Sequence, residues 1–183
     1  YKIISAGLNE SVQHGKRGSQ GVAIALNVDG EGAWKAGEYE KHIDLGARVI
    51  AIRLLFNDHE NRDIGVFLIS AYAPVGNATD EEWNLFFEQL SKCISRKHHG
   101  DIILIGTDTN SSMGISQDKE DPIGKFGISH VNDSGRRLLS YLSINNLSVM
   151  STRFKKRSYA TWIHPRSKKQ HQIDHFFVNR EMM

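Results

Sequence analysis

The segment Ile102-Ile103-Leu104-Ile105-Gly106-Thr107-Asp108-Thr109-Asn110 is the part of the sequence that decides the fold. Its four consecutive apolar residues predict a short strand that is buried on both faces. A glycine then permits a tight exit from the strand, and Asp108 and Asn110 follow with one residue between them. In layered α/β folds ligands commonly bind at strand ends, so this pair is a candidate site. An ordinary Asx turn after a strand is the alternative.

The rest of the chain predicts mostly strands, with two helices placed between them. A capping box at Thr79–Glu82, followed by apolar residues at helical spacing as far as Ile94, predicts the first helix. The second is expected from about Asp133 to about Asn145. The expected strands are Gln20–Val28, Arg48–Phe56, Ile64–Ala73, Ile102–Ile105, Leu147–Ser151, Tyr159–Ile163 and Gln172–Val178. This order indicates sheets at the core and helices on their outer faces, an α/β layered sandwich.

Length and composition predict one globular domain over residues 1–183. Hydrophobic residues make up 39% and charged residues 24%, which excludes a disordered chain, and no apolar run has the roughly 18 residues needed to span a membrane. The one cysteine, Cys93, excludes a disulfide framework and a Cys-rich zinc site and indicates a reducing compartment. Because the chain begins with Tyr1 and not with Met, we expect a fragment or a trimmed sequence.

Positive charge is concentrated near the C-terminal end of the chain. Seven Lys and Arg residues and no acid occur from Arg153 to Lys169. Such a cluster can neutralise phosphates, but charge alone leaves a solvated basic loop equally open. Within it, two expected strands flank a loop that carries Trp162 and His164 at its base and Arg166, Lys168 and Lys169 beyond. A solvated hairpin is the alternative for this segment.

A tyrosine marks another expected strand end, in Ser70-Ala71-Tyr72-Ala73-Pro74. The Tyr72 hydroxyl there could donate a hydrogen bond to a phosphate. On its own, a tyrosine at the edge of the core before a turn is the simpler interpretation.

These segments, taken in order, resemble the exonuclease–endonuclease–phosphatase superfamily, most closely the endonuclease domains of LINE-type retrotransposons and craniofacial development protein-like domains. The matching motifs are Gly21–Ala25, Tyr72-Ala73-Pro74, Gly106–Asn110, Thr161-Trp162 and Ile173-Asp174-His175. Each motif is weak alone, and their order and spacing make the match specific. The resemblance covers nearly the whole chain. It implies a four-layered α/β sandwich, in which two packed, mostly antiparallel sheets are flanked by helices.

The resemblance also implies roles for individual residues. Asp108 would align and activate the water that attacks phosphorus, and Asn110 would hold that water or a phosphate oxygen. Tyr72 would donate to the scissile phosphate, and Asp174 would orient a catalytic histidine. Mg²⁺, with Mn²⁺ as the alternative, would neutralise charge on the phosphate. Arg166, Lys168, Lys169, Trp162 and His164 would contact DNA as substrate-binding residues.

Three departures from the family pattern matter, and the first two indicate that the chain lacks both ends of the domain. The glutamate that is the main metal ligand would lie upstream, and Glu10 has no good claim to its role. The closing Ser-Asp-His motif would lie downstream, because His175 follows Asp174 on one strand and should point to the opposite face. Thr107 occupies a position that is often glycine in the family. Among the ligands, the resemblance leaves only Asp108 as a possible metal contact.

The first functional hypothesis is therefore a fragment of a Mg²⁺-dependent endonuclease that nicks DNA and is inactive alone. A phosphatase of the same fold acting on a small phosphoester, and a non-catalytic remnant that binds DNA or protein, are the alternatives. The expected partner is DNA, together with a reverse transcriptase domain in the same polyprotein, and no membrane. An intracellular location is expected, and a nuclear one if the protein is a retroelement endonuclease.

Overall fold

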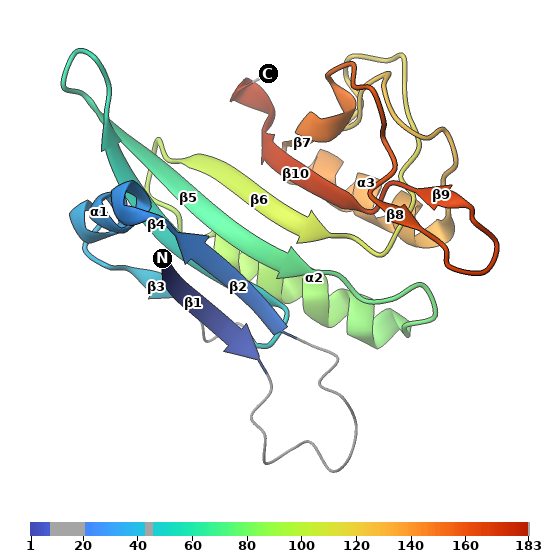
Figure 1. Cartoon of the computed structure of the whole chain (residues 1–183), viewed down its shortest axis with the longest axis horizontal. Coiled ribbons are helices and arrows are strands. Elements are labelled where there is room, and N and C mark those ends of the chain that lie inside the picture. Colours follow the sequence, from blue (N-terminus) through green and yellow to red (C-terminus); the bar gives the residue numbers. More distant parts are fainter. Residues whose placement is uncertain (8–20, 43–45, 183) are drawn as a thin grey trace, which may run out of the picture.

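A six-stranded sheet forms the centre of the molecule (Figure 1). The computed structural model describes residues 1–7, 21–42 and 46–182. The strand order is β3 (Lys41–His42), β4 (Val49–Asn57), β5 (Asp63–Tyr72), β6 (Ile102–Asp108), β10 (Asp174–Asn179) and β7 (Leu147–Val149). Only β5 and β6 pair in parallel, because the long helix α2 (Asp80–Ile94) connects them, and every other neighbouring pair is antiparallel.

Two helices, α2 and α3 (Asp133–Ile144), cover one face of this sheet. The predicted capping box is confirmed, since Thr79 accepts from the Glu82 amide and Glu82 accepts from the Thr79 amide. Residues that alternate along the central strands point toward these helices. The resulting core includes Phe67, Ile69, Trp83, Phe86, Leu90, Cys93, Ile105, Leu138, Leu142 and Phe177.

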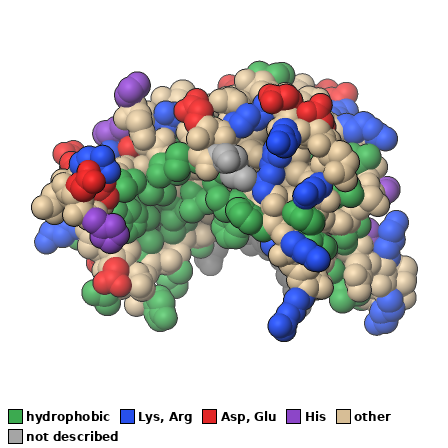
Figure 2. Space-filling view, turned by 90° about the horizontal axis from the view of Figure 1, so that it is seen from above, with side chains coloured by type: hydrophobic (Ala, Val, Ile, Leu, Met, Phe, Trp, Pro, Cys, Tyr) green, Lys and Arg blue, Asp and Glu red, His purple; other side chains and the backbone are tan. Residues whose placement is uncertain are grey.

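The described residues cover only half of the opposite face of the sheet. A hairpin of β1 (Lys2–Gly7) and β2 (Gly21–Leu26), together with α1 (Val28–Ala36), packs on β4 and β5. Its core contains Ile4, Ile24, Trp34, Ile50 and Ile52. Over β6 and β10 the same face is open: Leu104 is half-buried and the Phe176 side chain is 54% exposed. Figure 2 shows an apolar hollow on one face of the molecule.

The expected α/β architecture with mostly antiparallel sheets is confirmed. The second sheet consists here of two strands, and α1 packs beside this hairpin on β4 rather than outside it. Smaller elements complete the described chain: the hairpin of β8 (Trp162–Ile163) and β9 (Gln170–His171), and the 3₁₀ turns Met150–Thr152 and Arg180–Met182. Among the described helices, none has both the length and the apolar character that crossing a membrane requires.

Several expected elements differ in their bounds. The strand expected to reach Val28 ends at Leu26, because Asn27 caps α1 by accepting from the Gly30 amide. The strand expected from Ile102 to Ile105 continues to Asp108, so Asp108 is its last residue rather than a loop residue beyond it. Of the strand expected over Tyr159–Ile163, only Trp162 and Ile163 pair with a neighbour. Glu10, which was given no role, lies outside the described residues.

Candidate active site

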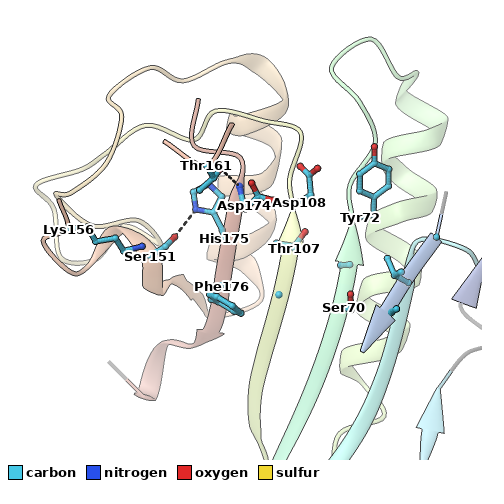
Figure 3. A pocket seen from close by; sticks show the side chains of 15 residues that line it. Ser70, Tyr72, Thr107, Asp108, Ser151, Lys156, Thr161, Asp174, His175 and Phe176 are labelled. Atoms are coloured by element: carbon cyan, nitrogen blue, oxygen red, sulfur yellow. Dashed lines mark hydrogen bonds between the residues drawn. The ribbon is translucent and has the colours of Figure 1, made fainter. Parts of the chain in front are cut away.

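Three of the predicted residues form a row across three adjacent strands. Parallel pairing places Tyr72 of β5 opposite Asp108 of β6, and antiparallel pairing places Asp174 of β10 opposite Asp108 on its other side. Residues at directly paired positions point to the same face of a sheet. Figure 3 shows the Tyr72 and Asp108 side chains side by side at the ends of their strands, with Asp174 next to Asp108. We call these three residues the catalytic row, after the roles that the sequence resemblance assigns to them.

Asp108 and Asn110 form an Asx turn at the end of β6. The Asn110 amide donates to Asp108 Oδ1 at 2.8 Å, and Asn110 adopts a left-handed backbone conformation with φ of 46°. The Asn110 side chain donates through Nδ2 to the Ala73 carbonyl at 2.9 Å, which ties the turn to the end of β5. The turn considered as an alternative is thus present. This turn also holds Asp108 in the row. The other carboxylate oxygen, Asp108 Oδ2, accepts no hydrogen bond from a described residue.

The environment of Asp108 disfavours its charged form. Burial raises the pKa of the Asp108 carboxyl from its ordinary value; the hydrogen bond from the Asn110 amide opposes this rise, and the neighbouring charge of Asp174 adds to it. A carboxylate whose pKa is moved toward neutrality is a better proton acceptor at physiological pH. This suits the predicted role of Asp108 in activating water.

Asp174 is held at the start of β10 by Thr161. The Thr161 hydroxyl accepts from the backbone amides of both Ile173 and Asp174, at 3.0 and 3.1 Å. The Thr109 hydroxyl and amide both donate to the Ile173 carbonyl, at 2.7 Å each, from the chain that follows β6. The Asp174 side chain itself remains exposed. Hydrogen bonds made by Thr109 and Thr161 therefore connect the backbone segments next to Asp108 and Asp174.

Tyr72 is supported from behind by an arginine. The Arg48 guanidinium lies 5.5 Å from the centre of the Tyr72 ring and donates to the carbonyls of Tyr72 and Ala73 at 3.3 and 3.4 Å. These contacts hold the strand end and the ring together. The Tyr72 ring also packs against the core under the β1–β2 hairpin, and its hydroxyl points beyond the end of β5 (Figure 3).

His175 points away from the catalytic row, as the alternation of the strand predicts. It is 4% exposed, and Asp174 before it is exposed. The ring donates through Nε2 to the Gln172 carbonyl at 3.1 Å, which leaves Nδ1 to accept from the Ser151 hydroxyl at 2.8 Å. Burial lowers the pKa of His175 to about 4, so the ring is neutral at physiological pH. This histidine is a structural group and not the partner of Asp174.

The predicted substrate-binding residues lie on the β8–β9 hairpin. Trp162 is 41% exposed and its ring lies between those of His164 and His171, with centroids 5.4 and 5.2 Å away. His164 Nδ1 accepts from the amides of Arg166 and Ser167, so this nitrogen stabilises the turn. Arg166, Lys168 and Lys169 are exposed at the turn. Trp162 and the three cations are therefore accessible to a ligand, whereas His164 also stabilises the turn.

Two cavities meet at Asp108. One, of about 550 Å³, is lined by Tyr72, Asp108 and Asp174 together with Ser151, Lys156 and Phe176. The other, of about 460 Å³, is lined by Asp108, Asn110, Ser111, His130, Trp162 and His171. Tyr72 thus borders the first cavity, Asn110 and Trp162 border the second, and Asp108 and no other residue of the catalytic row borders both.

Sequence reasoning missed several residues that line these cavities. Thr161 was quoted only as part of the Thr-Trp motif, and its hydroxyl acts on residues 12 and 13 positions later. Ser111 is 1% exposed, its hydroxyl has no hydrogen-bond partner among the described residues, and it lines the second cavity. Lys156 was counted within the basic run but not distinguished from its neighbours. No periodicity or motif signals these contacts, because each depends on chain segments far apart in sequence.

The residues present do not by themselves fit a complete magnesium site. A hard cation of this kind takes several oxygen ligands, often with carboxylates among them. Within residues 1–7, 21–42 and 46–182, no group of three or more His, Cys, Asp or Glu side chains is placed to hold a metal ion. Asp108 and Asp174 are the two carboxylates of the catalytic row, and they are neighbours on paired strands.

Comparison with known proteins places the chain near one curated protein. It is 29% identical over 135 residues to craniofacial development protein 2 of Bos taurus and 28% identical over 138 residues to that of Tragulus javanicus. The matches cover 73% and 74% of this chain but 22% and 24% of those proteins. The chain thus spans about a quarter of the length of the curated relatives it matches. No family model matches the sequence.

Among solved structures, similar ones include an endonuclease/exonuclease/phosphatase family protein from Leptotrichia buccalis, with 17% identity and a TM-score of 0.45 over 73% of this chain and 41% of that one. The APE2 catalytic domain of Xenopus laevis gives 14% identity and a TM-score of 0.45 over 75% of this chain and 48% of that one. A mannosyl-6-phosphatase of Bacteroides thetaiotaomicron gives 12% and 0.43 over 72% and 43%.

Proposed function

We propose that this chain carries part of a phosphodiesterase site that nicks DNA by attack of water on a backbone phosphate, as in a retroelement-type endonuclease. The observation that supports this best is the catalytic row itself. Tyr72, Asp108 and Asp174 lie at paired positions on three adjacent strands, with Asn110 fixed beside them. These are the residues to which the sequence resemblance assigns roles, and they are brought together from segments about 100 residues apart.

In the proposed reaction Asp108 acts on water. Its Oδ1 is engaged by the Asn110 amide, so Oδ2 accepts the proton of the attacking water as the new phosphorus–oxygen bond forms. The phosphorus–oxygen bond to the leaving strand breaks on the opposite side of phosphorus, and the leaving oxygen takes its proton from solvent water. The second amide hydrogen of Asn110, or its carbonyl oxygen, orients that water or a phosphate oxygen, since Nδ2 already donates one hydrogen to Ala73. The Tyr72 hydroxyl donates to a non-bridging oxygen of the phosphate, where negative charge builds up in the transition state.

The proposed reaction depends on Mg²⁺, with Mn²⁺ as the alternative. Because the described carboxylates do not complete such a site, no step of the reaction is assigned to the metal. The histidine that Asp174 would orient is likewise not His175, whose ring is buried and engaged by Ser151 and Gln172. DNA, a reverse transcriptase domain in the same polyprotein and a nuclear location are proposals of the same kind.

DNA is favoured over a small phosphoester by the shape of the charged surface. Figure 2 shows Lys and Arg side chains gathered over one half of the molecule. Both cavities at Asp108 adjoin this cationic region, through Lys156 on one side and the β8–β9 hairpin on the other. An extended cationic surface suits a polymer with a phosphate at every residue, whereas a small substrate needs one compact anion site.

Nicking of supercoiled plasmid DNA tests this proposal. The longest reading frame that contains this sequence should convert plasmid to the open-circular form in Mg²⁺, and Asp108→Ala should lower the rate at least about a hundredfold. The matched control is Asp118→Ala, in a polar loop outside both cavities. The 183-residue chain alone should show little nicking. Equal rates for the Asp108→Ala protein and the unmodified one would refute the proposed role and leave a non-catalytic DNA-binding remnant as the better account.

A further inference from the structure

The loop Phe154–Arg157 is a charged surface that is separate in sequence from the β8–β9 hairpin. All four residues are exposed, and three of them are cations: Lys155, Lys156 and Arg157. None of these three forms an ion pair with a described residue, and the sequence holds no acid between Arg153 and Lys169. No ion pair with a described residue engages these side chains, so their charge is available to neutralise an anion that binds there.

The loop is presented on a firm base. Before it, the Arg153 guanidinium donates to the Ser148 hydroxyl at 3.3 Å and to the Asp121 carbonyl at 2.5 Å. Within it, the Lys156 amide donates to the Tyr159 hydroxyl at 3.1 Å. The preceding Ser151 and Thr152 are buried. The cations thus project from an anchored segment, which lowers the entropy lost when they are ordered on a ligand.

The position of the loop links it to the catalytic row. Lys156 lines the same 550 Å³ cavity as Asp108 and Asp174, and Figure 3 shows it across β10 from Asp108, with its amine toward Ser151. The β8–β9 hairpin borders the other cavity, through Trp162 and His171. Since Asp108 lines both cavities, a phosphate chain that passes over Asp108 lies near both cationic segments.

The first residue of the loop is aromatic. The Phe154 side chain is 56% exposed, although burying such a ring is worth about 2 kcal/mol. Single exposed apolar residues are common on protein surfaces and need no explanation. An exposed ring directly followed by three unpaired cations is, however, the combination that binds single-stranded nucleic acids, by stacking a base on the ring while the cations hold the backbone.

We propose that Phe154–Arg157 is a second nucleic-acid-binding segment, which holds a single-stranded stretch of the substrate beside the catalytic row and stacks one unpaired base on Phe154. This inference rests on the proposed function and extends it, because it assigns to the substrate an unpaired region next to the phosphate that is cut. The β8–β9 hairpin holds the other side of the same polymer.

Fluorescence anisotropy with the 183-residue chain tests the proposal, using a labelled single-stranded DNA of about 20 nucleotides and the matching duplex in a KCl series from about 50 to 200 mM. The variant Lys155→Gln/Lys156→Gln/Arg157→Gln should bind the single strand at least about tenfold more weakly and reduce the slope of log Kd against log[KCl] by about 2. The control Lys2→Gln/Lys35→Gln/Lys92→Gln removes the same charge from exposed positions outside both cavities and should keep the slope.

Phe154 gives an independent arm of the same experiment. Phe154→Ala should weaken single-strand binding about tenfold with an unchanged salt slope, and Phe154→Trp should restore it. The duplex should respond less to either substitution, because its bases are already stacked. A triple variant that binds like its charge-matched control overturns the second segment and leaves the proposed function standing. Absence of DNA binding by the unmodified chain overturns both, since the cationic surface then has no polymer to hold.

Discussion

Asp108 lies at the end of a buried strand and opposite a second carboxylate, and this environment disfavours its charged form. Burial is the main reason that its pKa is raised, and Asp174 adds to the effect. A group whose pKa is higher in the folded state than in the unfolded state is held best when protonated. Its contribution therefore favours folding at low pH and is lost as pH rises through the folded pKa. At neutral pH Asp108 costs stability, which is common where a side chain is kept for chemistry.

Asp108→Asn should consequently stabilise the protein at pH 7 while it removes the proposed base. The asparagine keeps an oxygen for the Asn110 amide and carries no charge. The gain should stay below about 1 kcal/mol, because the carboxylate is partly screened by water. Urea unfolding followed by circular dichroism at pH 7 and pH 3.5 measures it, and the gain should shrink at the lower pH. A variant that is less stable than the parent at pH 7 contradicts the assigned direction of the pKa shift.

His175 predicts a pH dependence of the opposite sign. Its pKa is lowered to about 4 by burial, below the ordinary value of 6.5, so folding holds it neutral. The contribution of the neutral His175 ring to the unfolding free energy is complete above pH 6.5. It is lost as pH falls toward 4, by on the order of 3 kcal/mol. His175→Gln, which cannot titrate, should flatten the dependence of the unfolding free energy on pH between 6.5 and 4. Equal slopes for the two proteins over this range would show that another group controls acid unfolding.

At the scale of elements, the sequence predicts the parts whose signal is local. The continuous apolar runs of β4, β5 and β6 and the Thr79–Glu82 capping box are visible in neighbouring residues, and the structure confirms them. Helix α1 was missed because Gly30 and Gly32 lower its helix propensity, and packing of Ala33 and Trp34 on the sheet compensates. The strand β1 was missed because its pairing with β2 depends on a segment about 20 residues away.

The sequence names the residues of the candidate site, but it does not determine how these residues are arranged in space. The order of Tyr72, Asp108 and Asp174 along the chain suggests a common site, yet adjacency requires the strand order β5-β6-β10 and the registers that pair all three. A shift of one residue in either pairing would send a side chain to the helix-covered face. Such a register is set by long-range packing, so residue patterns within one strand do not determine it.

Thr161 is the contact that ties β8 to the start of β10, and its removal should loosen Asp174. Thr161→Val keeps the shape of the side chain but leaves the amides of Ile173 and Asp174 without their acceptor. We expect a loss of about 0.5–1.5 kcal/mol in stability, because water can reach the two amides, and faster hydrogen exchange at both. Thr161→Ser retains the hydroxyl and serves as the control. Unchanged exchange at both amides in the valine variant would show that the backbone of β10 is held without Thr161.

At the scale of the whole molecule, the two faces of the sheet are covered unequally. Helices α2 and α3 close one face from β4 to β7, whereas the β1–β2 hairpin and α1 close only the β4–β5 half of the other. Asp108 and Asp174 of the catalytic row lie at the end of this uncovered half, where Phe176 and Gly106 help to line the 550 Å³ cavity. The same opening that gives access to Asp108 and Asp174 therefore exposes apolar surface to water.

Two neighbouring phenylalanines on β10 differ in exposure because the two faces of the sheet are covered unequally. Phe177 is 2% exposed in the helix-covered core, and Phe176 is 54% exposed on the open face. Phe177→Ala removes a buried ring and should cost about 3–5 kcal/mol of unfolding free energy. Phe176→Ala removes a ring that touches water and should cost less than about 1 kcal/mol. It should also reduce self-association in sedimentation velocity, because an exposed apolar patch favours contact between molecules. Equal losses of stability for the two variants would mean that the β6–β10 face is covered in solution, and the route proposed here for a phosphate chain to Asp108 would then be closed from that side.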